Sequence, residues 1–362
     1  MNTNHTDIHK SFLSLARLGL GQSANAMISV ENWSSIQNLA MEQGLYAIVL
    51  DGIEKLPSVS RPPQELLLEW IGEVLQDYEY CYEQYKKAIA ELASFYNAHG
   101  FKMMVLKGYA CSLDWPKPSH RPCGDIDIWL FGRQADADAA LGSWFKVQGS
   151  SQEIDNSHHH HTVFNWGGFT VENHYDFVNV HAHRSSAELE RVFKELGKDD
   201  SHSVEVNGEK VYLPSQNLHA LFLIKHMVSH FAAAEINLRQ VLDWAFFVEK
   251  HTKEIDWMWL DSMLEKYCMK EFVNCINGIC VEDLGFGAGI FHEVKLLPAL
   301  KDRILKDILN PEYTSAEPEG FVRRFIYKYK RWQGNAWKQR LCYKESRWEY
   351  FWSGLWAKML KP

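Results

Sequence analysis

Two aspartates stand two residues apart in the stretch Gly124-Asp125-Ile126-Asp127-Ile128, which continues into the apolar run Trp129-Leu130-Phe131. Alternate residues of a β-strand point to the same face, so a strand here would place both carboxylates side by side. Two like charges on a half-buried face are costly unless a positive group lies between them. A divalent cation is one answer, because one or two carboxylates together with substrate phosphates commonly bind Mg²⁺. The other is an edge strand whose aspartates face water, since short motifs match by chance.

The chain before this pair offers groups suited to phosphate. Residues 102–108 (Lys-Met-Met-Val-Leu-Lys-Gly) are typical of a short buried strand ending in a cation, Lys107, and a glycine, Gly108. A backbone can turn tightly against a phosphate at such a glycine. A proline-rich loop follows over 114–122 and carries Arg121. Lysine and arginine both suit phosphate oxygens, although each is also compatible with an ordinary solvated cation.

A third carboxylate follows in a second stretch rich in aromatic and β-branched residues, 169–177 (Phe-Thr-Val-Glu-Asn-His-Tyr-Asp-Phe). This composition predicts a strand. Its alternation puts Glu172, His174 and Asp176 on one face, whereas the residues between them face the other way. If this strand lies beside the aspartate pair, Glu172 would complete a trio of carboxylates around a metal site.

The order of these motifs resembles a known family. Four segments carry the resemblance: Val-Leu-Lys-Gly-Tyr (105–109), Trp-Pro-Lys-Pro (115–118), Arg-Pro-Cys-Gly-Asp-Ile-Asp-Ile (121–128) and Val-Glu-Asn-His-Tyr (171–175). Together they look like the bacterial uncharacterised nucleotidyltransferase family of the polymerase-β-type superfamily, over nearly the whole chain. One departure concerns phosphate binding. Gly108-Tyr109 stands where the superfamily usually has Gly-Ser, so a serine that normally touches a phosphate is missing.

The resemblance implies a metal-dependent nucleotidyltransferase, a transferase of phosphorus-containing groups. Such an enzyme moves a nucleoside monophosphate from a nucleoside triphosphate, for instance ATP, to an acceptor hydroxyl that the sequence does not identify. By resemblance, Asp125 and Asp127 would bind two Mg²⁺ (or Mn²⁺) ions, and Glu172 would complete one metal site and accept the hydroxyl proton. The implied substrate-binding residues are Lys107, Gly108, Arg121 and His174. The alternative is a module of the same fold that binds a nucleotide or a partner without turnover, because fold does not fix function.

The composition is that of an ordinary globular protein, with 46% hydrophobic and 23% charged residues in 362. Its seven cysteines are odd in number, are widely spread and form no Cys-x-x-Cys pair, which favours a reducing compartment. The sequence contains no apolar run of the ~18 residues needed to span a bilayer, and its start has no signal-peptide pattern. These features predict a cytoplasmic protein with no transmembrane segment.

Charge is distributed unevenly along the chain. Residues 321–362 carry eleven Lys or Arg and two Glu, a net charge of +9, which leaves −17 on the remainder. A basic, aromatic segment of this kind could contact a polyanion or an anionic membrane surface. It could equally bind the acidic remainder of its own chain, and we favour this second interpretation.

The chain is expected to form an α+β protein in which a small mixed β-sheet of the nucleotidyltransferase type is flanked by helical N- and C-terminal regions. Three regions are predicted: helical residues 1–100, a catalytic core at 101–213, and helical residues 214–362 with the basic aromatic tail. A long helical pattern runs from Gln64 to about His99. A hairpin is expected to turn at Asn207-Gly208, a strong local turn signal.

One further constellation is a run of four histidines, His158 to His161. Histidine is the commonest metal ligand, so a transition-metal site is conceivable. Consecutive strand residues cannot all face one ion, however, and a flexible loop binds metal only loosely. An exposed loop is therefore the favoured interpretation, with one histidine near the nucleotide as the other, because the run directly precedes the strand region that carries Glu172.

Overall fold

The computed structural model describes residues 2–24, 28, 30–181, 183–295 and 297–346, which fall into two compact units. The first, here called the helical unit, comprises the chain up to Glu79 together with Asp114–Pro122 and Ile224–Cys342. The second, the sheet unit, comprises Tyr80–Leu113, Cys123–Leu223 and the chain from Tyr343. The predicted division at residues 100 and 213 follows sequence order and stays a prediction, whereas the units are built from interleaved segments.

The sheet unit contains one six-stranded mixed sheet in the order β3-β4-β2-β1-β6-β5. The strands are β1 (Met104–Val105), β2 (Ile126–Trp129), β3 (His161–Trp166), β4 (Phe169–His174), β5 (Ser203–Val206) and β6 (Glu209–Tyr212). The central neighbours β2 and β4 run parallel, whereas β1–β2, β3–β4 and β5–β6 are antiparallel. The predicted hairpin turn is present: Asn207 and Gly208 both have positive φ, 49° and 87°, between β5 and β6.

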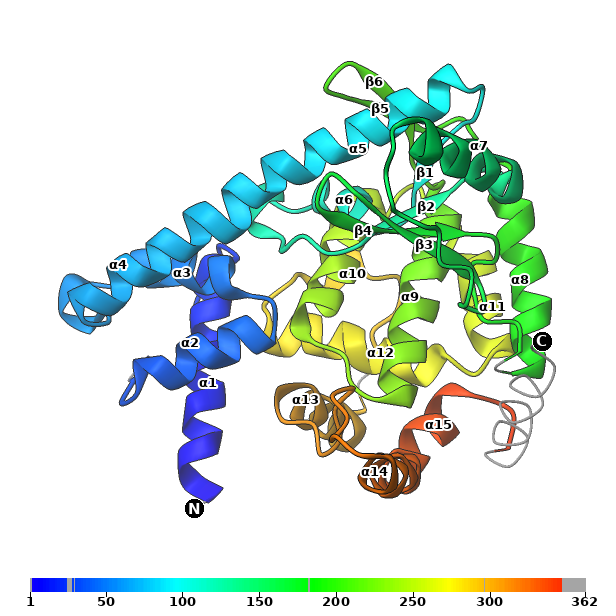
Figure 1. Cartoon of the computed structure of the whole chain (residues 1–362). Helices are drawn as coiled ribbons and strands as arrows, with labels where there is room; N and C mark the ends of the chain where they lie inside the picture. Colours follow the sequence, from blue (N-terminus) through cyan, green and yellow to red (C-terminus); the bar gives the residue numbers. More distant parts are fainter. Residues whose placement is uncertain (1, 25–27, 29, 182, 296, 347–362) are drawn as a thin grey trace. The chain divides into compact units, whose positions relative to one another are not determined.

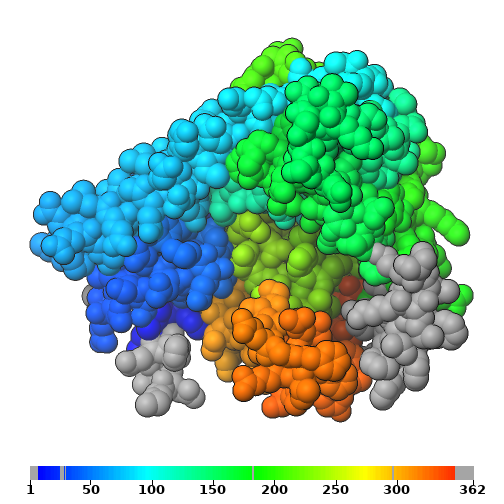
Figure 2. Space-filling model, viewed as in Figure 1, coloured from blue at the N-terminus to red at the C-terminus, as the bar shows by residue number. Residues whose placement is uncertain are grey.

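Among its described residues, the sheet unit contains the helices α5 (Cys81–Ala98), α6 (Tyr109–Ser112), α7 (Gln134–Val147) and α8 (Arg184–Leu196). Helix α5 crosses one face of the sheet, with α7 on the same side (Figure 1). Its outer surface lies at the surface of the molecule (cyan in Figure 2). The long helical pattern predicted from Gln64 corresponds to α4 (Gln64–Glu73), a π-helical segment η2 (Val74–Tyr80) and α5 in direct succession.

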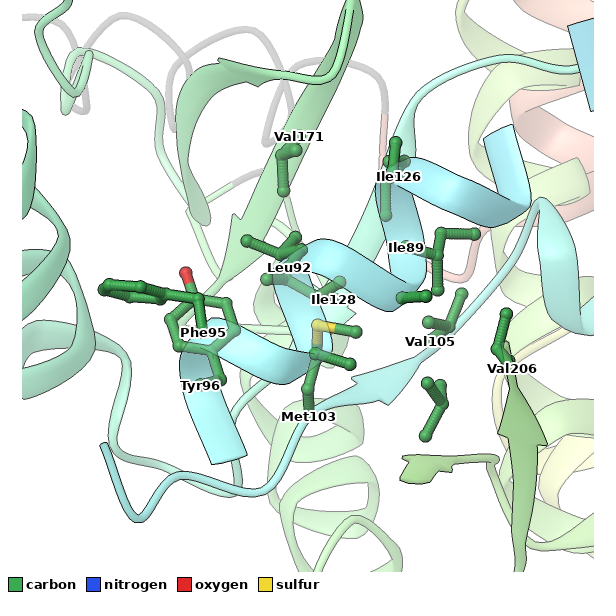
Figure 3. Close-up of a cluster of buried hydrophobic side chains, with 14 of the residues drawn as sticks. Ile89, Leu92, Phe95, Tyr96, Met103, Val105, Ile126, Ile128, Val171 and Val206 are labelled. Atoms are coloured by element: carbon green, nitrogen blue, oxygen red, sulfur yellow. The ribbon is translucent and has the colours of Figure 1, made fainter. Parts of the chain in front are cut away.

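The core of the sheet unit lies between α5, α7 and this face of the sheet. Figure 3 shows Ile89 and Leu92 of α5 beside Ile126, Ile128 and Val171 of the central strands. All five side chains are fully buried. The alternation of β2 explains the arrangement, because Ile126 and Ile128 point into this core and the residues between and after them must point to the opposite face.

The helical unit contains no strand among its described residues. Its helices are α1 (Asn2–Gly19), α2 (Trp33–Glu42), α3 (Tyr46–Glu54), α4, α10 (Leu238–His251), α11 (Trp257–Lys266), α12 (Lys270–Gly278), α13 (Pro298–Leu309), α14 (Phe321–Gly334) and α15 (Ala336–Cys342). Helix α9 (Gln216–Ala233) begins in the sheet unit and ends in the helical unit. Short 3-10 or π segments are η1 (Ser58–Ser60), η3 (Pro118–His120), η4 (Ile279–Asp283) and η5 (Ala288–Ile290). Among the described residues, none of these helices combines the length and apolarity needed to cross a membrane.

Several basic residues of the C-terminal segment form ion pairs within the helical unit. The Glu317 carboxylate forms ion pairs with Lys328 at 3.1 Å and with Arg331 at 3.3 Å. Lys338 of α15 is almost fully buried and bonds the carbonyl of Ala234 at 2.7 Å, with Asp307 at 2.5 Å. These contacts accord with the favoured intramolecular interpretation of the basic tail. Residues 347–362 of that tail lie outside the described residues.

The turn after β1 depends on a glycine. Gly108 has a φ of 58°, in the left-handed region, and a Cβ atom added there would lie 2.3 Å from the Tyr85 hydroxyl and 3.3 Å from the Asp125 carbonyl oxygen. The Tyr85 hydroxyl itself donates to that carbonyl at 2.9 Å. A side chain at position 108 would therefore separate β1 from the segment entering β2, besides straining the backbone.

Gly108→Ala is expected to lower the free energy of unfolding by about 2 kcal/mol or more, since left-handed strain and a steric clash add. Urea denaturation followed by circular dichroism would measure it. Gly100→Ala is the matched control: its φ is 73°, but an added Cβ would meet nothing within 4 Å. That variant should lose only the strain contribution of about 1 kcal/mol. Equal losses for the two variants would contradict the proposed close approach.

Candidate active site

The sheet face opposite α5 gathers the acidic and histidine side chains of three neighbouring strands. Asp127 of β2 is directly opposite Glu172 of β4 in a parallel register, and Trp129 is opposite His174. One potential ligand atom from each of Asp127, Glu172 and His174 lies within 4.8 Å of the other two. Strand parity, inferred from the sequence for Asp127 and for Glu172 separately, thus places them on one face.

The same face of the sheet also carries Trp129 of β2. The Trp129 ring packs against Phe177 with centroids 4.5 Å apart, and its indole nitrogen donates to the Gly197 carbonyl at 3.1 Å. Phe177 in turn packs on Phe193 of α8. One end of the face therefore joins a second hydrophobic cluster, and the polar side chains concentrate at the other end.

Lys107 compensates the charge of the buried Asp127. Its Nζ atom lies 2.8 Å from Asp127 Oδ1, and Asp127 is only 3% exposed. Burial opposes ionisation, but the ammonium group of Lys107 and the hydrogen bond with His174 outweigh it and hold the pKa of Asp127 well below its usual range. Asp127 is therefore an ionised carboxylate at neutral pH.

His174 bridges the two carboxylates. Its Nε2 atom lies 3.2 Å from Asp127 Oδ1 and 3.7 Å from Glu172 Oε2. Burial disfavours the imidazolium, yet the hydrogen bonds to Asp127 and Glu172 prevail and raise the pKa of His174 to about 8. Burial also works against ionisation of Glu172, but the hydrogen bond from His174 leads to a pKa below its ordinary value. Without a metal ion, Lys107 and His174 supply the positive charge that two adjacent carboxylates require.

Two members of the histidine run border this group. His161 begins β3 directly opposite His174, and its Nε2 lies 3.8 Å from Glu172 Oε1. Burial lowers the pKa of His161 to about 4 and, with the positive charge of His174 nearby, that of His160 to about 3. Both rings are thus uncharged at neutral pH.

Asp125 lies outside this compact group. It precedes β2 by one residue, its side chain is exposed, and its carbonyl accepts the Tyr85 hydroxyl. The ligand trio in the described structure contains His174 where the sequence predicts Asp125. That Asp125 shares a cation with Asp127 stays a prediction.

Arg121 belongs to the helical unit and forms a buried two-pronged ion pair there. Its Nε and Nη2 atoms donate to the two carboxylate oxygens of Asp243 at 2.8 and 2.9 Å. Trp115 donates to the same Asp243 at 2.9 Å, so the pair ties both ends of the proline-rich loop to α10. The predicted contact between Arg121 and a triphosphate is untested by this arrangement and stays a prediction.

From the sequence, Lys107 was expected to contact a phosphate, so its ion pair with Asp127 was not predicted. The sequence left open whether one histidine of the run lies near the nucleotide, and it did not single out His160 or His161. The signal for His161 was present, because a strand beginning there and paired antiparallel to 169–174 sets it opposite His174. No pattern in the sequence indicates the ion pair between Lys107 and Asp127, because it depends on how β1 lies beside β2.

A comparison with known protein families agrees with the sequence motifs. Residues 29–285 match the family described as uncharacterised nucleotidyltransferase. The chain belongs to this family. The family resemblance inferred from the motifs is thereby confirmed. No curated protein matches the chain.

A similar solved structure is that of an antigenic nucleotidyltransferase-like protein from Paracoccidioides brasiliensis. The two share 15% sequence identity over 57% of this chain and 96% of that chain, with a TM-score of 0.33.

The segment that leaves β4 is fixed by a buried carboxyl group. Glu190 of α8 is 4% exposed and accepts the backbone N–H groups of Phe177 and Val178 at 3.1 and 3.0 Å. Burial raises the pKa of Glu190 to about 7. The folded protein therefore binds a proton at Glu190 more tightly than the unfolded chain does.

Stability should consequently fall as pH rises. A carboxyl whose folded pKa is raised contributes stability that is present below its unfolded pKa of about 4.5 and is lost as pH passes about 7. Relative to Glu190→Gln, the wild type should lose on the order of 3 kcal/mol between pH 4.5 and 8, at 1.36 kcal/mol per pKa unit. Denaturation at several pH values measures this slope. A hydrogen bond lost in the variant would shift its free energy of unfolding by the same amount at every pH. Parallel plots of unfolding free energy against pH for wild type and variant would contradict the raised pKa of Glu190.

Proposed function

We propose that this nucleotidyltransferase family member moves a nucleoside monophosphate from a nucleoside triphosphate to an acceptor hydroxyl, with Asp127 and Glu172 as the ligands of Mg²⁺ or Mn²⁺. The observation that carries the proposal is the cross-strand pair of these two ionised carboxylates on a face of the sheet. Membership of the family supports nucleotidyl transfer as the reaction class.

The residues present suit a hard divalent cation. Two carboxylates from adjacent strands supply oxygen donors, and Mg²⁺ characteristically takes one or two such ligands and leaves its other positions to water and substrate phosphates. Lys107 and His174 already place positive charge against Asp127, which indicates that these carboxylates require a cationic partner and that a metal ion would have to displace the two side chains. When bound, the cation would stabilise charge on the attacking and leaving oxygens.

In the proposed reaction, the acceptor hydroxyl oxygen forms a bond to the α-phosphorus while the bond to the α–β bridging oxygen breaks. Pyrophosphate leaves with the bonding electron pair, and the hydroxyl proton passes to Glu172, whose pKa is lowered and which is therefore ionised. His174 is protonated at neutral pH, so its role is to orient Asp127 and Glu172 rather than to act as a base.

Phosphate recognition is assigned to the turn after β1. Lys107 already lies at the carboxylate pair, and its flexible ammonium group can exchange Asp127 for a phosphate oxygen. Gly108 allows the backbone to approach closely there. We keep Asp125 as a second cation ligand and Arg121 as a phosphate contact, the latter conditional on release from Asp243.

Nucleotide or partner binding without turnover is the second candidate. The observation that favours it is the Lys107–Asp127 ion pair, in which a side chain of the protein itself balances the buried negative charge. Gly108-Tyr109 also replaces the Gly-Ser pair whose serine normally contacts a phosphate in the superfamily.

Isothermal titration calorimetry with ATP, GTP, CTP and UTP, with and without Mg²⁺, separates these candidates. We expect one triphosphate to bind in a Mg²⁺-dependent way, and Glu172→Gln and Asp127→Asn to weaken binding at least roughly tenfold, or about 1.4 kcal/mol. The bound nucleotide is then incubated with candidate hydroxyl compounds, and release of pyrophosphate is measured.

Asp200→Asn is the matched control, because it removes an exposed carboxylate of the same unit that pairs with Lys102. It should bind as the wild type does. Metal-independent nucleotide binding that survives Glu172→Gln would favour the non-catalytic candidate. Binding of no triphosphate would contradict the transferase and leave only partner binding.

A further inference from the structure

A second group of potential metal ligands adjoins the carboxylate pair and consists of histidines. One ring nitrogen from each of His160, His161 and His174 lies within 4.8 Å of the other two. The ring centroids are 4.3 Å apart for His160 and His161, 5.3 Å for His161 and His174, and 5.6 Å for His160 and His174. Three imidazoles in mutual contact are an unusual concentration of nitrogen donors.

These histidines are held by the sheet rather than by a loose loop. His161 pairs with His174 across β3 and β4. The His160 carbonyl accepts the backbone N–H groups of Tyr175 and Asp176, each at 3.0 Å, which extends the pairing beyond the last residue of β4. The interpretation of the run as an exposed loop therefore holds for His158, which is exposed, but not for His160 and His161.

Two buried nitrogens in this group have no hydrogen-bond partner. Nδ1 of His160 and Nδ1 of His161 are both inaccessible to solvent and make no hydrogen bond within the described part of the chain. His161 is only 6% exposed as a residue. Buried polar groups are normally satisfied, so an orphaned nitrogen in a cluster of three imidazoles points to a missing partner.

We propose that His160, His161 and His174 form a binding site for a divalent transition-metal ion of the zinc type. Imidazole nitrogen suits Zn²⁺, whereas Mg²⁺ requires oxygen ligands, so the donor set separates this site from the carboxylate pair. Zn–N bonds of about 2.0–2.1 Å place tetrahedral nitrogens roughly 3.3 Å apart, which side-chain rotation from the present spacing can reach.

Three protein ligands leave a fourth position, as in zinc sites that bind an exchangeable group. Glu172 borders the three histidines, because its carboxylate oxygens lie 3.8 Å from His161 Nε2 and 3.7 Å from His174 Nε2. The site therefore borders the proposed nucleotidyl-transfer site and shares His174 with it, so a bound ion requires His174 to lose its proton and its hydrogen bond to Asp127. The inference does not rest on the proposed function, since it follows from the histidines alone.

The test is metal binding by the full chain, purified without a histidine tag and stripped with a chelator. Calorimetry with Zn²⁺ should give one site per chain that excess Mg²⁺ does not displace. Co²⁺ should give the intense visible absorption of a tetrahedral nitrogen-ligated ion. His160→Ala and His161→Ala should each weaken Zn²⁺ binding roughly tenfold to a hundredfold and diminish the Co²⁺ bands.

His158→Ala is the matched control from the same run, because His158 is exposed and contacts Asp155 at 3.4 Å. Its Zn²⁺ affinity should stay within about twofold of the wild type. Equal losses of Zn²⁺ affinity for His158→Ala and His161→Ala would indicate loose chelation by the run and would overturn the proposal. Displacement of Zn²⁺ by Mg²⁺, or no Zn²⁺ binding at all, would also overturn it. Circular dichroism of each variant, together with the more conservative variant His161→Gln, shows whether a loss of Zn²⁺ affinity is due to misfolding. Zinc binding without any nucleotide binding would refute the proposed function and leave this inference intact.

Discussion

The parallel register between β2 and β4 is the constraint on which the rest of the site depends. It sets Asp127 beside Glu172 on one face and Ile126 beside Val171 on the other. The apolar pair is locked into the core beneath α5, so the acidic pair has no freedom to separate. A one-residue slip would exchange the two faces, burying the carboxylates in the core and exposing the isoleucines. Apolar packing of Ile126 and Val171 on one face thus holds the two carboxylates together on the other face despite their repulsion.

That repulsion is balanced by two positively charged side chains, Lys107 and His174. Lys107 arrives from the end of β1, where Gly108 lets the chain turn at close range, and His174 arrives from β4 itself. Removing one partner of a buried ion pair commonly costs 3–5 kcal/mol, so the site is stable only as a balanced set. A cation could replace Lys107 beside Asp127 while Lys107 moves to a phosphate oxygen. Such an exchange of partners leaves the charge state of the protein unchanged.

The sequence was sufficient for features that local patterning decides. Alternation predicted that Glu172 and His174 share a face, and turn chemistry predicted the hairpin at Asn207-Gly208. The continuous helical pattern from Gln64 was also correct, and the family was confirmed. These features arise from side-chain period and backbone preference within a few residues.

Features that depend on distant partners could not be read from one sequence. Nothing near Arg121 signals that Asp243, 122 residues away, occupies its guanidinium. Nothing in the histidine run distinguishes exposed His158 from His161, because the difference arises only when β3 pairs with β4. Similarly, the alternation of Asp125 and Asp127 predicts one shared face, but β2 begins only after Asp125, so a shared cation for the two stays a prediction.

The central claim is that the Asp127–Glu172 pair is a cation site used with a nucleotide. Anomalous diffraction from crystals grown with Mn²⁺ and a non-hydrolysable triphosphate tests it directly, because the metal is located independently of any activity. The account predicts an anomalous peak within coordination distance of both carboxylates, with the triphosphate beside Lys107. A bound triphosphate whose Mn²⁺ lies away from Asp127 and Glu172, with the Lys107–Asp127 ion pair intact, would contradict it.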